Sequence, residues 1–167
     1  MITHDRLLEL VDYDPDTGIF TNKIRRSNVS PIGKVLGTKN ASGHLVAQLD
    51  KRMYLLHRLA WFYCFKEWPD DILDHIDRNP ENNSIYNLRE ATKITNSYNS
   101  KLRKDNTSGI RGVYFDKRRN LYYSQIVANK QKTFLGYFDT KEAAAEAYST
   151  AAKLAHGEFL NEDTVYG

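Results

Sequence analysis

The chain has 167 residues, of which 41% are hydrophobic, so one ordinary domain or two small ones are expected and disorder over most of its length is not. No run of 18 or more apolar residues is present, which excludes an apolar membrane span. The first ten residues carry acidic side chains and no small-residue cleavage site, unlike a secretory signal. A single cysteine excludes an intrachain disulfide and a four-cysteine zinc site, and a cytoplasmic protein is expected.

The formal net charge of +3 is distributed unevenly along the chain. Residues 1–100 hold 13 basic and 13 acidic side chains, and residues 136–167 hold two basic and six acidic ones. Residues 101–135 hold nine basic and two acidic side chains, with tyrosine and phenylalanine between them. A basic stretch with interleaved aromatic residues favours a nucleic-acid-binding surface over a strip of solvated charge.

The first third of the chain predicts a short helix followed by turns and strands. Residues 3–11 are typical of a helix with Thr3 as its N-cap. A proline and an Asp-Thr-Gly turn then reverse the chain before a strand at residues 19–23. Residues 22–42 predict loops around one short strand. Their basic run at residues 23–26 is equally compatible with DNA backbone contacts and with solvated charge.

The next stretch predicts a hairpin and a buried helix. Residues 44–56 contain two apolar runs around a polar turn, which indicates a hairpin. Residues 57–65 are strongly apolar and predict a helix that ends at the following Trp-Pro pair. Cys64 is expected to be a buried core thiol. His57 is expected to pack or hydrogen-bond at the helix start rather than to ligate a metal.

Short apolar runs alternate with polar loops further on. Residues 72–76 and 86–89 predict two short strands, and residues 77–84, with three asparagines and a proline, predict an irregular loop between them. Residues 92–102 predict a helix. The order is therefore strand, loop, strand, helix.

A polar break at residues 105–109 is the expected domain boundary. Three strand-like runs follow, at residues 112–116, 121–128 and 132–138. Their connections are short enough for hairpins. An alanine-rich helix is predicted over residues 141–156, with Thr140 in its cap and Gly157 at its end. Its broad face of small side chains is suited to lying close against a sheet.

The polar residues of the middle stretch suit phosphodiester hydrolysis, which needs a base to activate water and a cation to stabilise developing charge. Hard divalent cations such as Mg²⁺ prefer oxygen ligands. Asp74 and Asn96 supply such oxygens if the strand and the helix face each other, and His75 is then available as the base. Because neighbours on a regular strand point to opposite faces, pairing Asp74 with His75 requires a local bend, which the loop starting at Asp77 offers.

Residues 54–100 resemble the HNH endonuclease family, whose fold is the ββα-metal finger. The resemblance rests on HRLAW, DHID, the Asn-Asn of PENN, NLREAT and the later N-x-x-N. It implies that His75 is the general base and that oxygens of Asp74 and Asn96 hold the metal. It also implies that Asn87 orients the base. Asn83 and Asn99 are alternates. Many members carry a four-cysteine zinc knuckle, which is missing here, so the helix over residues 57–65 is expected to brace the finger by packing.

Residues 108–159 resemble the plant ethylene-response (Apetala-type) DNA-binding domain through SGIRGVYF, LYYSQI, FLGYF, DTKEAAAEAY and the closing HGEF. That domain lays a three-stranded antiparallel sheet in the DNA major groove with a helix packed behind it. The resemblance implies DNA contacts from Arg111, Lys117, Arg118, Arg119, Tyr122 and Lys132. The family's second strand usually carries a Trp and an Arg where this chain has Tyr122 and Val127. The plant target sequence is therefore not carried over.

The sequence thus predicts an α+β chain with an HNH nuclease domain over residues 1–104, its finger at about 70–102, and an Apetala-type domain over residues 108–160. The first contains the ββα-metal finger, N-terminal strands and a bracing helix, and the second a small three-stranded antiparallel sheet packed on one helix. Phage and intron-borne homing endonucleases combine such domains, and the whole chain resembles that group. The predicted setting is the cytoplasm of a phage-infected or prophage-bearing bacterium.

The predicted function is a DNA endonuclease that uses Mg²⁺ or Mn²⁺ to hydrolyse phosphodiester bonds of double-stranded DNA. As a monomer or weak dimer with one finger per chain, it is expected to nick. No membrane partner and no small-molecule substrate are expected. Two alternatives stay open: a sequence-specific DNA-binding regulator with an inactive finger, and a structural or RNA-binding basic protein.

Overall fold

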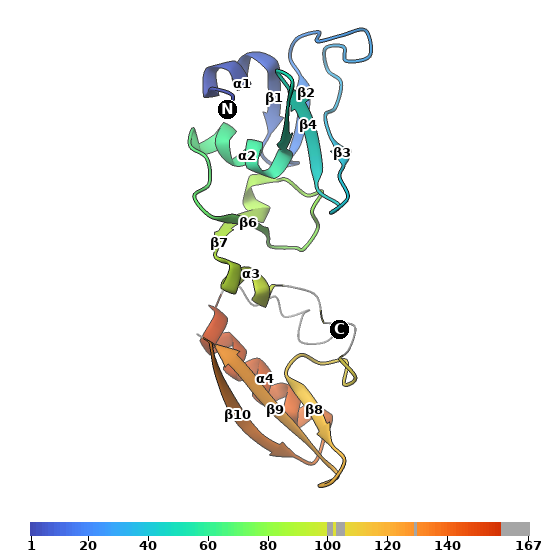
Figure 1. Ribbon diagram of the computed structural model, residues 1–167, viewed down its shortest axis with the longest axis vertical. Helices are drawn as coiled ribbons and strands as arrows, with labels where there is room; N and C mark the ends of the chain where they lie inside the picture. The colour runs from blue at the N-terminus through green and yellow to red at the C-terminus, as the bar shows by residue number, and fades with distance from the viewer. Residues whose placement is uncertain (100–101, 103–105, 129, 158–167) are drawn as a thin grey trace. The chain divides into compact units, whose positions relative to one another are not determined.

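The computed structural model describes residues 1–99, 102, 106–128 and 130–157, and the chain divides into two compact units, Met1–Thr92 and Lys93–Gly167 (Figure 1). Helices and small antiparallel sheets together confirm the predicted α+β class. Within these ranges, no helix has both the length and the hydropathy needed to cross a bilayer. Parts of the predicted domain boundary, of the predicted finger end and of the HGEF motif lie outside the described residues.

The first unit begins with a capped helix and a hairpin. Helix α1, His4–Leu10, has Thr3 as its N-cap, as predicted, and the Thr3 side chain accepts from the backbone N–H of Arg6. Strands β1, Val11–Asp14, and β2, Ile19–Asn22, pair antiparallel around the predicted turn. Strand β1 was predicted as the end of the helix and the start of the turn. Its alternating buried and exposed residues explain why it forms a strand instead.

A three-stranded antiparallel sheet follows in the order β3, β4, β5. Its strands are β3, Thr38–Lys39, β4, Leu45–Leu49, and β5, Arg52–Leu55. The predicted hairpin is therefore confirmed. Its two turn residues, Asp50 and Lys51, both have positive φ angles, 43° and 66°, as a tight two-residue turn between twisted strands requires.

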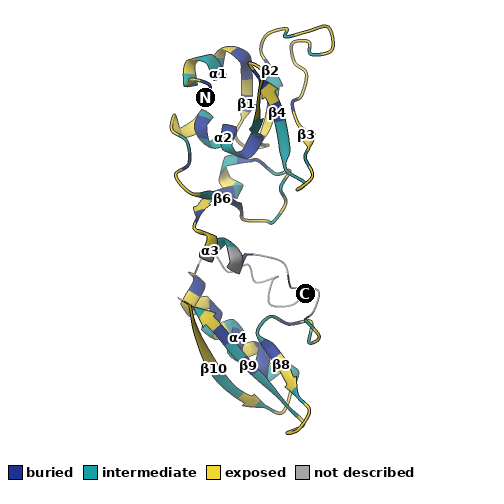
Figure 2. Ribbon diagram, in the orientation of Figure 1, coloured by how far each residue is buried: buried dark blue, intermediate teal, exposed yellow. Residues whose placement is uncertain are grey.

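Helix α2, Leu56–Phe65, packs its first two turns into the core of the first unit (Figure 2). Its buried residues are Leu56, His57, Leu59, Ala60 and Phe62. The prediction that Cys64 is a buried thiol is wrong, because its side chain is exposed. The last turn of α2 runs past the core: Phe65 is 49% exposed, and Lys66 ends the helix in the left-handed conformation.

Strands β6, Ile72–His75, and β7, Leu88–Ala91, pair antiparallel, and the loop between them ends in a 3-10 turn, η1, Ile85–Asn87. This turn delays the second strand by two residues relative to the prediction. Leu88 of β7 belongs to the same hydrophobic core as the buried residues of α2. The helix therefore braces the strand pair by packing.

The second unit contains helix α3, Lys93–Tyr98, and a sheet backed by a long helix. The strands are β8, Val113–Asp116, β9, Leu121–Ala128, and β10, Gln131–Phe138, in the order β10, β9, β8. Helix α4, Lys141–His156, is capped by Thr140 and covers one face of this sheet. Its buried side includes Ala144, Tyr148 and Ala152, so the alanines allow close approach.

Candidate active site

Asp74 and His75 are neighbours at the end of β6, and their side chains lie on opposite faces of the β6–β7 pair. Each is buried, with 7% exposed. The register pairs Asp74 with Arg89 and His75 with Leu88, so strand alternation sends one side chain to each face. The expected local bend is not found within β6, whose pairing is regular through His75. The chain turns only afterwards, where the Arg78 N–H donates to the His75 carbonyl at 2.9 Å.

An arginine holds the Asp74 carboxylate. Its Oδ2 accepts from Nε and Nη2 of Arg89 at 3.0 and 2.8 Å. The Arg89 side chain is only 13% exposed, so this ion pair is largely shielded from water. The two donors of one planar guanidinium fix the orientation of the carboxyl group.

The imidazole of His75 is oriented by Asn83, which is fully buried. His75 Nε2 lies 3.2 Å from Asn83 Oδ1, and the Asn83 amide donates to the Glu81 carbonyl at 3.3 Å. Because the amide nitrogen is the donor there, Oδ1 is the acceptor, and Nε2 carries the hydrogen. This tautomer places the proton-accepting lone pair on Nδ1. Burial lowers the pKa of His75, although the Asn83 hydrogen bond opposes the shift, so the ring is neutral near pH 7.

Asn83 is in turn fixed by the N-terminal turn. The Tyr13 hydroxyl donates to the Asn83 carbonyl at 2.8 Å, and the Ser84 hydroxyl donates to the Pro15 carbonyl at 3.0 Å. A Cβ atom at Gly18 would lie 2.3 Å from the backbone of Asn83 and Ser84. The turn predicted from Asp-Thr-Gly therefore packs directly on the loop that carries Asn83. The sequence names Asn83 only as an alternate site residue, because no local pattern signals its contacts with Tyr13 and Gly18.

Asn87 ties the two ends of the loop together. Its Oδ1 accepts from the Asp77 N–H at 3.0 Å, and its Nδ2 donates to Asp77 Oδ1 at 2.9 Å and to the Asn82 carbonyl at 2.8 Å. Burial acts to raise the pKa of Asp77, but hydrogen bonds from Asn79, Asn82 and Asn87 outweigh it and lower the pKa. These contacts give Asn87 the position that an orienting role for the His75 loop requires.

Three imidazole rings meet in this region. The ring centroids of His44 and His57 lie 5.7 and 5.1 Å from that of His75, and 5.1 Å from each other. His57 is 5% exposed, and its Nδ1 is buried with no hydrogen-bond partner among the described residues. Burial lowers the pKa of His57 to about 3, and His75 and His44 act in the same direction. His57 therefore packs as a neutral ring against the predicted base.

The predicted metal ligands are one carboxylate and one amide oxygen, a donor set that fits a hard divalent cation retaining several waters. In the part of the chain that the structure describes, no three His, Cys, Asp or Glu side chains are placed to hold a metal ion. The predicted site has only two protein ligands, Asp74 and Asn96, so it would not form a group of three. Asn96 lies on α3 in the second unit, so its pairing with Asp74 stays a prediction.

The predicted DNA contacts of the second unit fall in different environments. Four of the predicted contacts are exposed at the two hairpin ends of the sheet: Lys117, Arg118, Arg119 and Lys132. Arg111 is half-buried near His156, since its charge contributes to the lowered pKa of His156 after burial. Tyr122 packs against the core beneath α4, beside Phe138 and on the opposite face from Tyr123. Tyr123, not Tyr122, therefore lies on the face that α4 leaves open.

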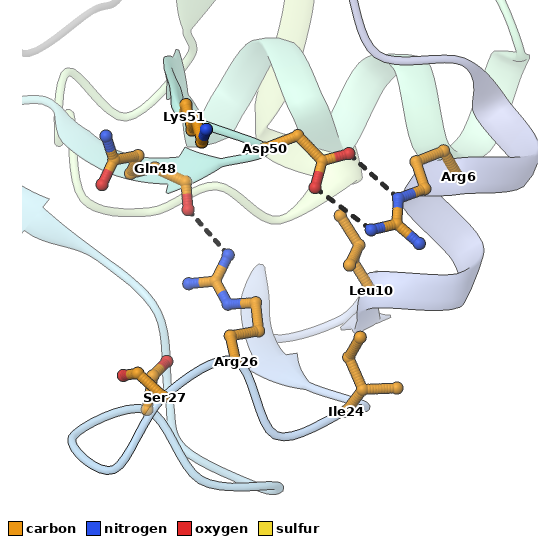
Figure 3. A pocket seen from close by; sticks show the side chains of 9 residues that line it. Arg6, Leu10, Ile24, Arg26, Ser27, Gln48, Asp50 and Lys51 are labelled. Carbon is orange, nitrogen blue, oxygen red and sulfur yellow. Dashed lines mark hydrogen bonds and ion pairs between the residues drawn. The ribbon is translucent and has the colours of Figure 1, made fainter.

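A basic cavity of about 480 Å³ opens between α1, residues 24–30 and the β4–β5 turn (Figure 3). Arg26 Nη1 donates to the Gln48 carbonyl at 2.6 Å, and Arg26 Nε is buried without a partner in the described ranges. Asp50 accepts from Nε and Nη2 of Arg6 at 2.9 and 3.2 Å. Part of the basic run at residues 23–26 is thus engaged within the protein, and its role toward DNA stays open.

The region of this site has known relatives. Residues 54–98 match the family described as HNH endonuclease, so this part of the chain is an HNH endonuclease domain. The chain is 38% identical over 87 residues to Protein 3.8 of Escherichia phage T7, covering 52% of this chain and 71% of that protein. It therefore belongs to the same family as that phage protein.

A second viral relative is also similar to this chain. An uncharacterized HNH endonuclease of Acanthamoeba polyphaga mimivirus is 36% identical over 106 residues, covering 62% of this chain and 54% of that protein. No solved structure matches. HNH endonucleases generally act on DNA and use divalent metal ions, which is consistent with the oxygen donors and the neutral histidine described above.

Proposed function

We propose that the chain is a divalent-metal-dependent DNA endonuclease of the homing type, which nicks double-stranded DNA in the cytoplasm of a phage-infected bacterium. The observation that carries the proposal is a neutral, buried His75, oriented by Asn83 and adjacent to an Asp74 held by Arg89, within the stretch that matches the HNH endonuclease family. The nuclease domain would span residues 1–104 and the targeting domain residues 108–160.

In this proposal His75 is the general base. Its Nδ1 lone pair accepts a proton from the attacking water, while Nε2–H remains hydrogen-bonded to Asn83. In-line displacement places the attacking and leaving oxygens on opposite sides of phosphorus. A divalent cation, Mg²⁺ or Mn²⁺, held by Asp74 and Asn96 would stabilise the charge on the phosphate and the leaving oxygen.

The second unit would supply DNA affinity. Its exposed cations lie at the hairpin ends of the β8–β9–β10 sheet and would contact backbone phosphates. A close approach seen at Gly112 supports the Apetala-type resemblance: a Cβ there would lie 2.2 Å from the ring of Tyr148. The glycine of SGIRGVYF and the tyrosine of DTKEAAAEAY therefore belong to one packing contact.

The test is an incubation of the protein with supercoiled plasmid and Mg²⁺ or Mn²⁺, with and without a chelator. We expect open-circular product that the chelator abolishes. His75→Ala should lower the rate by about a hundred-fold or more while leaving DNA binding intact, because a general base contributes roughly that factor. Tyr86→Ala, a change at a side chain that is 75% exposed beside the same loop, is the matched control and should cleave normally.

The outcomes separate the proposal from its alternative. Absence of any cut product with both metals, together with retained binding, would point to a DNA-binding regulator with an inactive finger. Cleavage that survives His75→Ala would leave the nuclease in place and remove His75 as its base. Linear product in a single step would replace nicking with a double-strand cut.

A further inference from the structure

Four aromatic rings form a continuous stripe on the open face of the second unit's sheet. The stripe consists of Tyr114, Tyr123, Tyr137 and Phe134. Tyr114 and Tyr123 are stacked at 5.2 Å and 21°, and Tyr123 contacts Tyr137 and Phe134 with centroids at 5.9 and 6.3 Å. Three of the rings are between 40% and 54% exposed, although burial would be expected for side chains of this type.

The strand register explains why all four rings share one face. Tyr114 pairs with Tyr123, and Tyr123 pairs with Tyr137, so these three lie side by side across the three strands. Phe134 is three residues before Tyr137, which in a regular strand would put the two on opposite faces. A bulge between Phe134 and Gly136 inserts the extra residue Leu135. The bulge returns Phe134 to the open face and leaves Leu135 against the core under α4.

Cations lie at both ends of this stripe. The β8–β9 turn carries Lys117, Arg118 and Arg119, and Lys132 stands near the opposite turn, beside Val127. Arg119 also lies 4.9 Å over the ring of Tyr137 and is ion-paired with Asp116 at 2.9 Å. The eight-residue strand β9 between the two turns spans about 27 Å. A nucleic-acid strand of several nucleotides would place phosphates at the ends and bases in the middle.

We propose that this aromatic stripe binds unpaired bases of single-stranded DNA by stacking, with the cations at the two turns holding its phosphates. The inference rests on the proposed role of the second unit in binding DNA and names the form of DNA that its open face takes.

The side chains on the open face of the sheet are better suited to stacking on unpaired bases than to binding base edges in a duplex groove. In a duplex the faces of the bases are covered by their neighbours, and a groove presents hydrogen-bonding edges that require polar partners. On the open face of the described strands, the centre is aromatic, and the polar side chains are Asp116, Gln125 and Lys132. An exposed ring stacks on any unpaired base, and several rings in a row suit a run of such bases.

The experiment measures binding of the full chain, in chelator, to three labelled probes by fluorescence anisotropy. The probes are a 12-nucleotide oligothymidine, an abasic strand of the same length, and a 12-base-pair hairpin duplex. We expect the oligothymidine to bind at least ten-fold more tightly than the abasic strand, which has the phosphates but no bases. Phe134→Ala and, on a separate strand, Tyr114→Ala should each weaken oligothymidine binding about ten-fold and leave abasic binding unchanged.

Phe115→Ala is the matched control, because Phe115 is similarly exposed at 45% but pairs with Tyr122 on the helix side of the same sheet. It should leave all three affinities unchanged, and circular dichroism should show all variants folded. Equal affinity for oligothymidine and abasic strands would overturn the inference. The inference would also be overturned if Phe134→Ala and Tyr114→Ala weakened only duplex binding, although that outcome would leave the proposed DNA-targeting role intact. Failure to bind any probe would overturn both.

Discussion

At the scale of single residues, Asn83 decides which nitrogen of His75 carries the hydrogen. Asn83→Leu keeps the side-chain volume and removes the acceptor, so we expect kcat to fall about ten-fold, the equivalent of one hydrogen bond of about 1.4 kcal/mol. The KM should change little, because Asn83 is buried away from substrate. Asn83→Asp retains an acceptor oxygen and should retain more activity. Equal losses in both variants, with matching losses of stability, would make Asn83 purely structural.

A second prediction concerns His57, whose pKa in the folded protein is about 3 because of burial. The unfolded chain takes up a proton near pH 6.5, and the folded one does not, so stability should fall as pH drops below about 6.5 and be unaffected above it. The contribution of His57 to this slope is at most about 1.4 kcal/mol per pH unit, and the lowered pKa values of His75 and His156 act in the same direction. Urea unfolding at pH 7 and pH 5 checks this. His57→Phe should make the dependence of stability on pH shallower. His4→Gln should leave it unchanged, because His4 lies outside the cluster of three imidazole rings.

At the scale of elements, the turn between β1 and β2 packs on the loop that carries Asn83, and two glycines test whether the turn supports that loop. Gly18 and Gly33 have nearly equal φ angles, +73° and +74°, but a Cβ at Gly18 meets backbone atoms whereas nothing lies within 4 Å at Gly33. Gly33→Ala should therefore cost only backbone strain, about 1 kcal/mol. Gly18→Ala should cost about 2 kcal/mol more and reduce cleavage, since it displaces Asn83.

Tryptophan fluorescence during urea unfolding is the suitable measurement, because Trp61 and Trp68, the chain's two tryptophans, both belong to the first unit. If Gly18→Ala and Gly33→Ala lowered the free energy of unfolding equally, the turn would have adjusted to the added Cβ, and the loop would not depend on it.

Local patterns predicted most elements of this fold. The Asp-His pair, the Asn-rich loop and the strands around it are readable because turn chemistry and short apolar runs are local signals. The placement of Asn83 against His75 was not readable, since Tyr13 and Gly18 hold it from a distant part of the chain. Sequence reasoning also chose Tyr122 over Tyr123 for DNA contact, although strand alternation alone cannot tell which of two neighbouring tyrosines faces a helix.

At the scale of the whole molecule, the proposed division of labour predicts the effect of removing the second half. A chain ending at residue 104 keeps the predicted finger and loses the sheet and α4. We expect its affinity for duplex DNA to fall by ten-fold or more and its salt dependence to become shallower, because fewer phosphates are neutralised. Binding titrations at several salt concentrations measure both. Unchanged affinity and slope would remove the targeting role of the second unit.

The hydrogen bond from Tyr13 to Asn83 joins residues 70 positions apart in the chain. Contacts of this separation close late, because the intervening segment must first be ordered. On the ribosome, the emerging N-terminal turn therefore has nothing to hold until residues beyond the loop have left the exit tunnel. A chain terminated between residues 75 and 83 would contain His75 without the Asn83 that orients it, so such incomplete translation products should leave the DNA of the producing cell uncut.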